Sequence, residues 1–194
     1  MPLKTLLSYA LFGGAFLSDL KTTGSVIPSS PFLGRRMAEG VPQDGDGLVI
    51  ELGVGTGAIT HSLVESGIDH DRLVAVDCSE EMVKWTRQRF PEARVLLGDA
   101  SKLRELLAGE SDLRDRQVSH VVSSLPLKSL PGELVRAIAD EVREILPESG
   151  RLIQFTYDLR PQPDPQLTDH FSLVSSSVVW CNFPPARVSV YQPA

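Results

Sequence analysis

The sequence predicts an α/β fold, in which a largely parallel β-sheet is covered by helices on both faces. Three observations predict it. Short apolar segments typical of buried strands alternate with helical segments between residues 48 and 157. Glycine-containing or polar turns follow these apolar segments. The 194 residues, 42% of them apolar, suffice for one domain with a substantial core and are too few for two comfortable domains.

Two helices are expected before this alternation begins. Apolar residues at steps of three and four form a stripe along the first, made of Leu3, Leu6, Leu7, Ala10, Gly14 and Leu17. The second is expected to have Ser30 as its N-cap, Pro31 at its first position and an end near Glu39. Residues 40–47, rich in Gly, Pro and Asp, are typical of a linker. We therefore divide the chain into N-terminal helices (residues 1–40) and a core (residues 41–194).

Strands and helices then alternate along the core. Strands are expected at about 48–52, 73–77, 93–97, 118–124 and 151–157, and helices at about 57–66, 80–89, 101–108 and 131–146. After a loop at 161–165, two more strands are expected at 171–181 and 187–191, joined by the tight turn 182–185. The tight turn makes them a C-terminal hairpin, which places one antiparallel strand at the end of the sheet.

The turn after the first strand, Glu51–Gly57, carries the strongest functional signal. Its sequence is Glu-Leu-Gly-Val-Gly-Thr-Gly, in which glycines permit positive φ angles and a close approach of the backbone to a ligand. The helix that follows presents free N–H groups, which suit a carboxylate. An acid before three alternating glycines is typical of enzymes that bind S-adenosylmethionine (SAM), and Glu51 would then take its amino group.

Three further strand ends supply polar residues. Asp77, followed by Cys78, would bind ribose hydroxyls. Asp99-Ala100 ends the third strand, where an acid can bind the amine of adenine. Ser123-Ser124 ends the fourth, where a methyl acceptor would lie. Because the ligand of an open α/β sheet sits beyond the carboxyl ends of the strands, these residues are expected in one pocket. The residues expected from these strand ends to bind the cofactor are Glu51, Gly53, Gly55, Thr56, Gly57, Asp77, Cys78, Asp99, Ala100 and Ser123.

A nicotinamide dinucleotide is the competing cofactor. Gly53-x-Gly55-x-x-Ala58 also satisfies the dinucleotide fingerprint, and Asp77 would grip ribose in either case. Glu51 before the first glycine, a third glycine at Gly57 and the polar third and fourth strand ends favour SAM. The sequence therefore predicts a seven-stranded, Rossmann-like class I SAM-dependent methyltransferase with an N-terminal helical extension.

Composition narrows the partners. The net charge of −6 argues against a broad nucleic-acid-binding face. Cys78 and Cys181 show no metal-binding spacing and the four histidines are scattered, so no metal site is expected. No apolar run reaches transmembrane length. Residues 6–17 lack the flanking features of a cleaved signal peptide, so we expect a cytoplasmic protein.

The segment Ser124-Leu125-Pro126-Leu127 informs the acceptor. Enzymes that methylate amino groups often carry Asn or Asp, an apolar residue, Pro, then Tyr or Phe, and the side-chain oxygen and a backbone carbonyl orient the amine. Ser124 stands in the Asn place here and Leu127 in the aromatic place. The missing aromatic removes the platform on which a flipped base would stack, which disfavours RNA or DNA.

Nearly all of the chain resembles the soluble bacterial phospholipid N-methyltransferases, which convert phosphatidylethanolamine stepwise to phosphatidylcholine. Related ornithine-lipid N-methyltransferases are also similar. The resemblance rests on residues 21–30, 51–57, 123–127, 156–157 and 182–186. It implies a peripheral enzyme that docks on the anionic inner face of the cell membrane by its N-terminal helix. The alternative is that this helix packs on the sheet as a lid. It also implies cofactor contacts for Thr23 and Ser25.

The acceptor half of the pocket is expected to combine an orienting hydroxyl with aromatic faces. Ser124 would orient the early amines, and Tyr157 and Tyr191 would surround the quaternary ammonium product, although Tyr191 could equally pack at the sheet edge. The residues expected to bind the substrate are Lys21, Leu125, Pro126, Asn182 and Arg187, the last on the lipid phosphate. Two other functions stay open, namely an RNA adenine N6-methyltransferase and a membrane-bound SAM-sensing module without catalysis.

Overall fold

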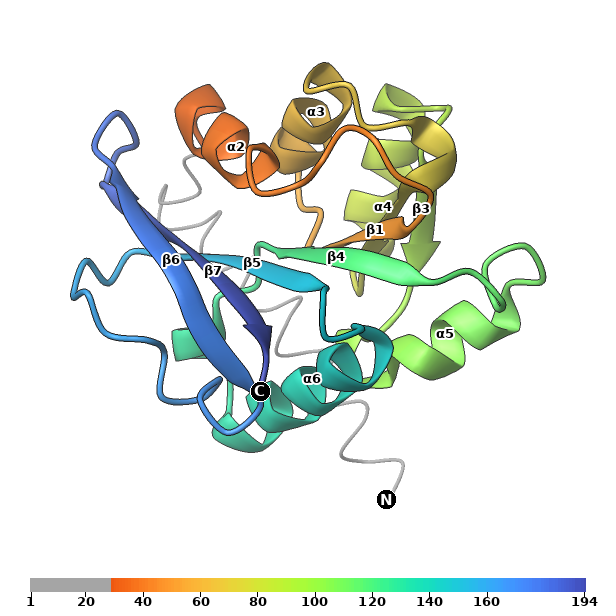
Figure 1. Cartoon of the computed structure of the whole chain (residues 1–194). Helices are drawn as coiled ribbons and strands as arrows, with labels where there is room; N and C mark the ends of the chain where they lie inside the picture. The colour runs from red at the N-terminus through yellow and green to blue at the C-terminus, as the bar shows by residue number, and fades with distance from the viewer. Residues whose placement is uncertain (1–28) are drawn as a thin grey trace.

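The computed structural model describes residues 29–194 and contains a seven-stranded sheet with the strand order β3-β2-β1-β4-β5-β7-β6 (Figure 1). The strands are β1 (Leu48–Leu52), β2 (Leu73–Asp77), β3 (Arg94–Leu97), β4 (Val118–Ser123), β5 (Arg151–Thr156), β6 (Phe171–Val179) and β7 (Ala186–Pro193). Strands β1 to β5 pair in parallel, whereas β7 is antiparallel to both β5 and β6. The predicted α/β fold is confirmed.

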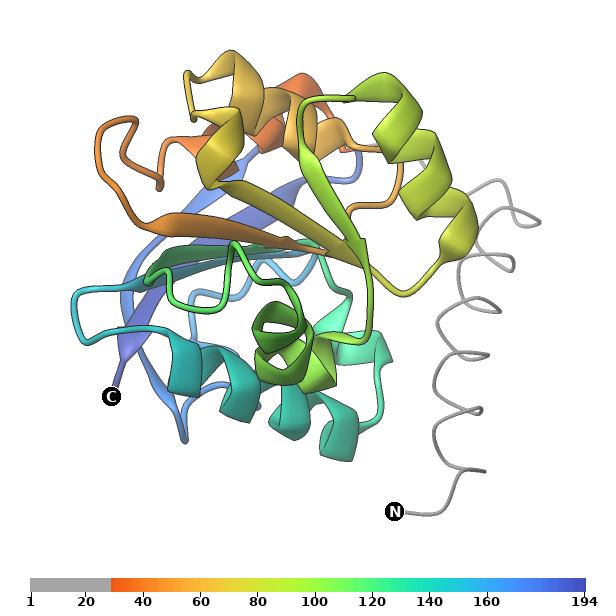
Figure 2. The same ribbon diagram turned by 90° about the vertical axis from the view of Figure 1, so that its right-hand side faces the viewer.

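Helices cover both faces of this sheet, as Figure 1 and the perpendicular view of Figure 2 show. The helices are α2 (Pro31–Ala38), α3 (Ala58–Glu65), α4 (Glu80–Arg89), α5 (Leu103–Gly109) and α6 (Gly132–Ile145). Helices α2, α3 and α4 lie on one face and α5 and α6 on the other. The central strands are therefore shielded from solvent on both faces. Every residue of β1 and β2 is buried, as expected for parallel strands between two helical layers.

Alternation along β1 divides the core between the two faces. Leu48, Ile50 and Leu52 pack with the α5 and α6 side, whereas Val49 packs with α2 and α3. Glu51 follows Val49 by two residues and so points to the α3 side, where the core is otherwise apolar. An acid in such a position needs a specific partner.

The second N-terminal helix is confirmed as α2. The Ser30 hydroxyl accepts a hydrogen bond from the Leu33 backbone N–H at 3.2 Å, and Pro31 occupies the first turn. Leu33 and Met37 are fully buried against α3 and the sheet. The first expected helix and its apolar stripe lie outside the described residues, as do Lys21, Thr23 and Ser25. The division at residue 40 stays a prediction.

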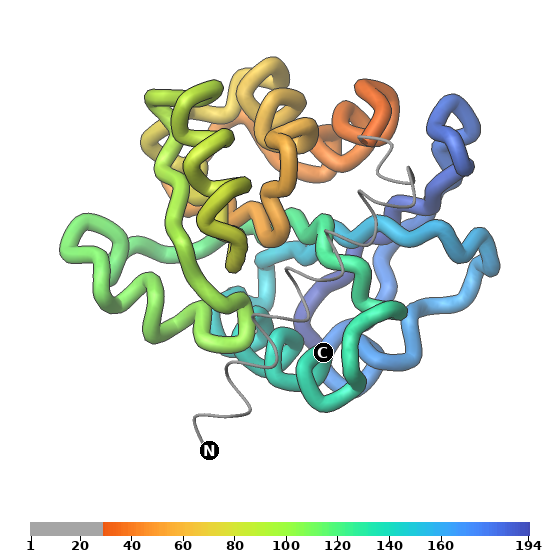
Figure 3. The backbone as a smooth tube through the Cα atoms, turned by 180° about the vertical axis from the view of Figure 1, so that it is seen from behind, coloured from red at the N-terminus to blue at the C-terminus, as the bar shows by residue number. Residues whose placement is uncertain are grey.

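The C-terminal hairpin is confirmed and sets the position of its turn, residues 180–185. Because β7 is antiparallel to both neighbours, β6 runs in the same direction as β1 to β5. The turn therefore lies at the edge where the parallel strands end, and Figure 3 shows it projecting beside α2. Within residues 29–194, every helix is too short or too polar to cross a bilayer.

Candidate active site

The residues predicted at the strand ends lie side by side along one edge of the sheet. Leu52 pairs with Val76 on one side and with Ser123 on the other, and Asp77 pairs with Leu97. These pairs place the ends of four neighbouring strands side by side. The polar residues at or just after these ends therefore form a row, made of the Glu51–Gly57 turn, Asp77-Cys78, Asp99-Ala100 and Ser123-Ser124. The structure therefore brings the predicted cofactor residues of the described chain to one rim.

The glycine turn is shaped as the sequence predicts. Gly53, Gly55 and Gly57 have φ angles of 78°, 53° and 75°, in the left-handed region that favours glycine. A Cβ atom at Gly53 would come within 2.9 Å of the Leu125 side chain. The turn after β1 thus packs closely against the acceptor segment after β4, so the two halves of the site share a wall.

Glu51 is completely buried and half satisfied. Its Oε2 atom accepts a hydrogen bond from the Thr60 hydroxyl at 2.7 Å, whereas Oε1 has no hydrogen-bond partner among the described residues. Burial raises the pKa of this carboxyl from 4.5 to about 8, against the opposing effect of the Thr60 hydrogen bond. A cationic amino group beside Oε1 would supply both the missing donor and a compensating charge, which is what SAM carries.

Asp77 and Asp99 are held in place by local backbone groups. The two Asp77 carboxylate oxygens accept hydrogen bonds from the Gly55 and Ser79 N–H groups, each at 2.9 Å. Burial raises the pKa of Asp77, although these hydrogen bonds oppose the shift. The Asp99 Oδ1 atom accepts from the Ser101 N–H and hydroxyl at 2.9 and 2.8 Å. Asp77 therefore also fastens the glycine turn to β2, besides its predicted contact with ribose.

We expect Glu51→Gln to weaken SAM binding and to change how stability depends on pH. A carboxyl whose pKa is raised by folding stabilises the protein when protonated, and this contribution is lost as the pH rises from 4.5 through about 8. Wild-type protein should lose on the order of a few kcal/mol over this range that the Gln variant keeps. Urea unfolding of both proteins at several pH values measures the difference.

The same variant has a second readout. A ligand cation beside Glu51 favours the carboxylate, so the wild type should release a proton on binding SAM near pH 7, and the Gln variant should not. Calorimetry in buffers of different ionisation enthalpy reports this proton. Equal proton release by both proteins would contradict the assignment of Glu51 to the amino group.

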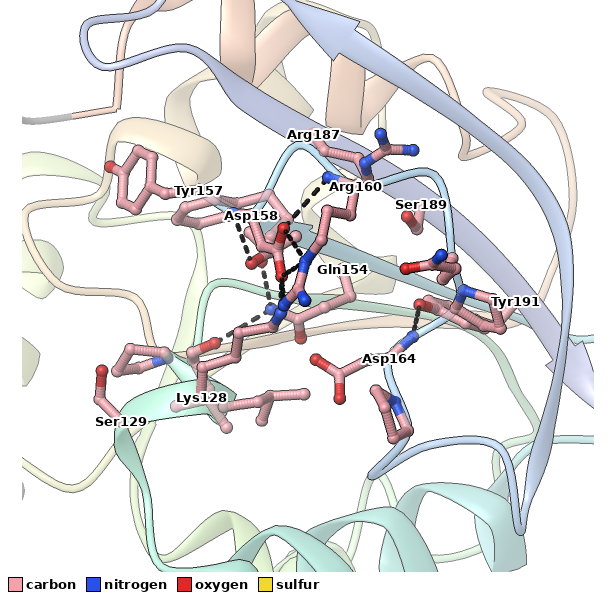
Figure 4. A pocket seen from close by; sticks show the side chains of 18 residues that line it. Lys128, Ser129, Gln154, Tyr157, Asp158, Arg160, Asp164, Arg187, Ser189 and Tyr191 are labelled. Carbon is pink, nitrogen blue, oxygen red and sulfur yellow. Dashed lines mark hydrogen bonds and ion pairs between the residues drawn. The ribbon is translucent and has the colours of Figure 1, made fainter.

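A cavity of about 290 Å³ lies beside the acceptor segment (Figure 4). It is enclosed by residues after β4, by β5 and the loop that follows it, and by β7. Its polar lining includes Lys128, Ser129, Gln154, Tyr157, Asp158, Arg160, Asp164, Arg187, Ser189 and Tyr191, and its apolar lining includes Leu125 and Pro126. Five of the residues predicted to bind or surround the substrate headgroup therefore line the cavity, namely Leu125, Pro126, Tyr157, Arg187 and Tyr191.

Arg187 is a buried cation without an acidic partner. It is 6% exposed, and its guanidinium donates to the Ser176 hydroxyl at 2.7 Å and to the Leu159 carbonyl. Its Nε atom is buried and has no hydrogen-bond partner, and among residues 29–194 no carboxylate forms an ion pair with it. A buried charge in this state favours an anionic ligand in the cavity.

The other charges of the cavity neutralise one another near its mouth. Asp158 forms ion pairs with Lys128 and Arg160, the latter at 2.6 Å. These cations, with Arg160 the largest contributor, hold the pKa of Asp158 well below its usual range. Asp158 is thereby paired with Lys128 and Arg160 and does not neutralise Arg187, which leaves the Arg187 cation available to an anionic ligand.

Gln154 is a site residue that the sequence motifs do not indicate. Its Nε2 atom donates to the Leu125 carbonyl at 3.0 Å and to the Phe155 carbonyl at 2.7 Å. Because both carbonyls can only accept, the amide oxygen must face the other way, and Oε1 is buried without a partner in the described chain. The available signal was a polar residue inside the apolar strand 151–156.

The remaining predicted residues divide between the rim and the cavity wall. The Ser124 hydroxyl is buried at the rim and has no hydrogen-bond partner among residues 29–194. Tyr157 is half exposed at the cavity, and burial raises its pKa against the opposing effect of the neighbouring Asn182 side chain. Tyr191 is buried nearer the C-terminal end of β7, where it pairs with Leu152 of β5, and its hydroxyl accepts a hydrogen bond from the Asp164 N–H at 3.1 Å. Tyr191 thus lines the cavity as part of its wall.

Asn182 shapes the hairpin turn as well as facing Tyr157. Its side-chain oxygen accepts from the Ser30 N–H at 3.0 Å, and its amide nitrogen donates to the Pro184 carbonyl at 2.7 Å. These contacts tie the start of α2, the turn and the cavity mouth together. Its predicted contact with the substrate stays a prediction.

Comparison with known proteins agrees with this geometry. Residues 49–150 match the family model of a methyltransferase domain. An ornithine lipid N-methyltransferase of Singulisphaera acidiphila is 31% identical over 151 residues, which cover 76% of this chain and 77% of that protein. A ribosomal RNA small subunit methyltransferase A of Phenylobacterium zucineum is 34% identical over 119 residues, covering 59% of this chain but only 35% of that protein.

Solved structures share the fold at low sequence identity. TrmN from Thermus thermophilus superposes with a TM-score of 0.67 at 20% identity, over 84% of this chain and about half (49%) of that chain. A glycopeptide N-methyltransferase complexed with SAM superposes with a TM-score of 0.64 at 15% identity, over 87% of this chain and 96% of that chain.

Proposed function

Since this chain belongs to the family of SAM-dependent methyltransferases, we propose that it methylates the amine headgroup of phosphatidylethanolamine, stepwise toward phosphatidylcholine, at a membrane surface. The observation that carries the proposal is Arg187, a buried cation without an acidic partner in the described chain, in a cavity that adjoins the acceptor segment. The similar ornithine lipid N-methyltransferase supports a lipid amine as the acceptor.

The cofactor of this chain is SAM, and the rim residues suit it. When bound, SAM supplies an electrophilic methyl group on its sulfonium. Glu51 Oε1 would hold the amino group, the N–H groups at the start of α3 the carboxylate, and Asp77 the ribose. Asp99 would bind the adenine amine. The chain contributes mainly by orienting the two reactants and excluding water.

An anionic group close to the amine is the feature that Arg187 would recognise. Phosphatidylethanolamine carries a phosphodiester close to its amine, and the amino-acid headgroup of an ornithine lipid carries a carboxylate. The Nε of Arg187, unpartnered among the described residues, offers a charge-assisted hydrogen bond that either anion can accept. Arg187 therefore supports an amino lipid with an anionic group in its headgroup. We propose the phospholipid because the sequence resembles phospholipid N-methyltransferases.

The positions of the strands make the two contacts compatible. Arg187 pairs with Thr156 of β5, and Ser123 pairs with Gln154 of the same strand from the other side. The backbones of β4 and β7 are therefore about 10 Å apart. The arginine side chain covers part of this gap, so that one small headgroup can extend from Arg187 toward Ser124.

Two buried oxygens of the chain are suited to orient the amine. Ser124 Oγ and Gln154 Oε1 both lack hydrogen-bond partners among the described residues and lie on neighbouring strands. Each can accept an N–H hydrogen bond and aim the nitrogen lone pair at the methyl group. The attacking amine must be neutral, and its resting pKa is near that of Lys, about 10.4. Its proton can leave to water, and Tyr157 would face the quaternary ammonium of the final product.

RNA adenine methylation is the second candidate, because the chain is similar to part of a ribosomal RNA methyltransferase. The lining of the cavity disfavours an RNA base as the acceptor. The acceptor segment has Leu127 where an aromatic platform would be needed, and Leu127 is buried. The net charge of −6 is also unfavourable for RNA.

Transfer of a labelled methyl group to alternative acceptors tests the proposal. We expect label from SAM to enter phosphatidylethanolamine in vesicles, with less label in ornithine lipid and none above background in ribosomal RNA. Heat-denatured enzyme is the control. Label in RNA alone would establish the second candidate, and SAM binding without transfer to any of these acceptors would point to a sensing module.

A further inference from the structure

The turn between β6 and β7 exposes two large aromatic side chains. Trp180 is 70% exposed and Phe183 is 78% exposed. Both belong to the turn 180–185, which projects beyond the sheet in Figures 1 and 3. A third exposed aromatic, Phe32, is the second residue of α2 and follows Ser30 by two positions, and the Ser30 N–H donates to Asn182 of the turn. Monomeric soluble proteins seldom gather large aromatics at one projecting point unless it contacts something.

The chemistry of this hairpin matches a lipid interface. From Phe171 to Ala186 the chain contains no charged residue and no histidine, so nothing in the segment would have to be dehydrated as a charge. Tryptophan and phenylalanine are suited to the boundary between headgroups and acyl chains. The tip is held rigidly by the Asn182 hydrogen bonds to Ser30 and Pro184, which lowers the entropic cost of insertion.

The tip also adjoins the mouth of the cavity. The Asn182 side chain lies near Tyr157, whose pKa it lowers against the effect of burial, and Tyr157 lines the cavity that contains Arg187. A lipid that leaves the bilayer beside the tip would therefore meet the cavity directly. Pairing of the edge strand β6 with a second copy of the chain is the competing occupant, but it would engage the strand backbone and leave the turn aromatics uncovered.

We propose that the β6–β7 turn inserts Trp180 and Phe183 into the surface of a lipid bilayer, with the cavity mouth facing the headgroups. The inference rests on the proposed function for its choice of a bilayer as partner. Because the inserted segment is uncharged, this contact should bind neutral vesicles and respond weakly to salt.

Tryptophan fluorescence of the full chain tests the insertion. The chain has two tryptophans, so Trp85→Phe leaves Trp180 as the reporter, and Trp180→Phe leaves Trp85 on α4, at the opposite end of the strand order, as the matched reference. On adding phosphatidylcholine vesicles with brominated acyl chains, we expect Trp180 emission to shift to shorter wavelength and to be quenched. Trp85 emission should stay unchanged.

A double variant gives the size of the contact. Trp180→Ser with Phe183→Ser should lower partitioning to neutral vesicles on the order of tenfold or more, with unchanged SAM affinity. Its methylation of phosphatidylethanolamine dispersed in detergent should be retained, which separates docking from chemistry. Unshifted Trp180 emission would overturn the insertion, whether or not the protein sediments with vesicles. Absent methylation by the wild type in detergent would instead overturn the proposed function.

Discussion

Gly53→Ala is expected to lower SAM affinity by about a hundredfold or more, equivalent to roughly 2.7 kcal/mol. Gly53 has a φ of 78°, and the added methyl group would lie 2.9 Å from the Leu125 side chain. Relief of this contact must move either the glycine turn or the acceptor segment, and both form the site. The strained backbone alone costs about 1–2 kcal/mol. Titration calorimetry with SAM measures the loss.

Gly109→Ala is the matched control for this substitution. Gly109 ends α5 without a positive φ, and a Cβ atom there would meet no other atom within 4 Å. This variant should bind SAM like the wild type. Wild-type affinity in Gly53→Ala, with the protein folded by circular dichroism, would show that the turn does not hold the cofactor as described.

Arg187→Met is expected to reduce methylation of phosphatidylethanolamine by about thirtyfold or more while leaving SAM affinity near the wild-type value. Removing one partner of a buried, hydrogen-bonded charge pair typically costs about 2–5 kcal/mol. Methylation of ornithine lipid should fall as well, because the carboxylate of its headgroup can pair with the same arginine. Initial rates of the wild type and the variant on vesicles of each lipid measure these losses.

Two further variants separate the role of Arg187 in binding from its role in folding. The Leu159 carbonyl and the Ser176 hydroxyl lose their donor in Arg187→Met, so that variant should also lose about 1–3 kcal/mol of stability. Arg187→Lys keeps the charge and should recover part of the phospholipid rate. Arg160→Met, at an exposed arginine paired with Asp158 in the same cavity, should have a small effect. An unchanged rate on phosphatidylethanolamine vesicles in Arg187→Met would contradict a phosphate contact.

Most helices and strands could be predicted from local sequence patterns, because the packing of the folded chain agrees with these patterns. The apolar strands of β1 and β2 begin and end where expected because glycine or polar residues follow each of them. Ser30 and Pro31 placed α2 by cap chemistry alone. The hairpin followed from the two prolines and Asn182 between two β-prone segments. The order of the last three strands, β5-β7-β6, could not be deduced from the sequence. The tight turn predicts that β6 pairs with β7, but it does not predict which of the two pairs with β5.

The cofactor half of the site was more predictable than the acceptor half. Glu51, Asp77 and Asp99 each lie at or next to the carboxyl end of a strand, and the parallel topology then requires them to share a rim. The acceptor cavity is assembled across strands that are distant in sequence. Gln154 is recognisable only once Leu125 lies beside it, and the burial of Arg187 depends on Leu159 and Ser176. Arginine on a late strand carries no local sign that it will lack an acidic partner.

The mass of the lipid product tests most directly whether the chain adds methyl groups to the amine of phosphatidylethanolamine. Purified protein is incubated with SAM and vesicles of phosphatidylethanolamine, and the extracted lipid is analysed by mass spectrometry. We expect species heavier by one, two and three methyl groups, all strongly reduced with Gly53→Ala and reduced with Arg187→Met. Unmodified phosphatidylethanolamine after incubation with protein that binds SAM would contradict this activity.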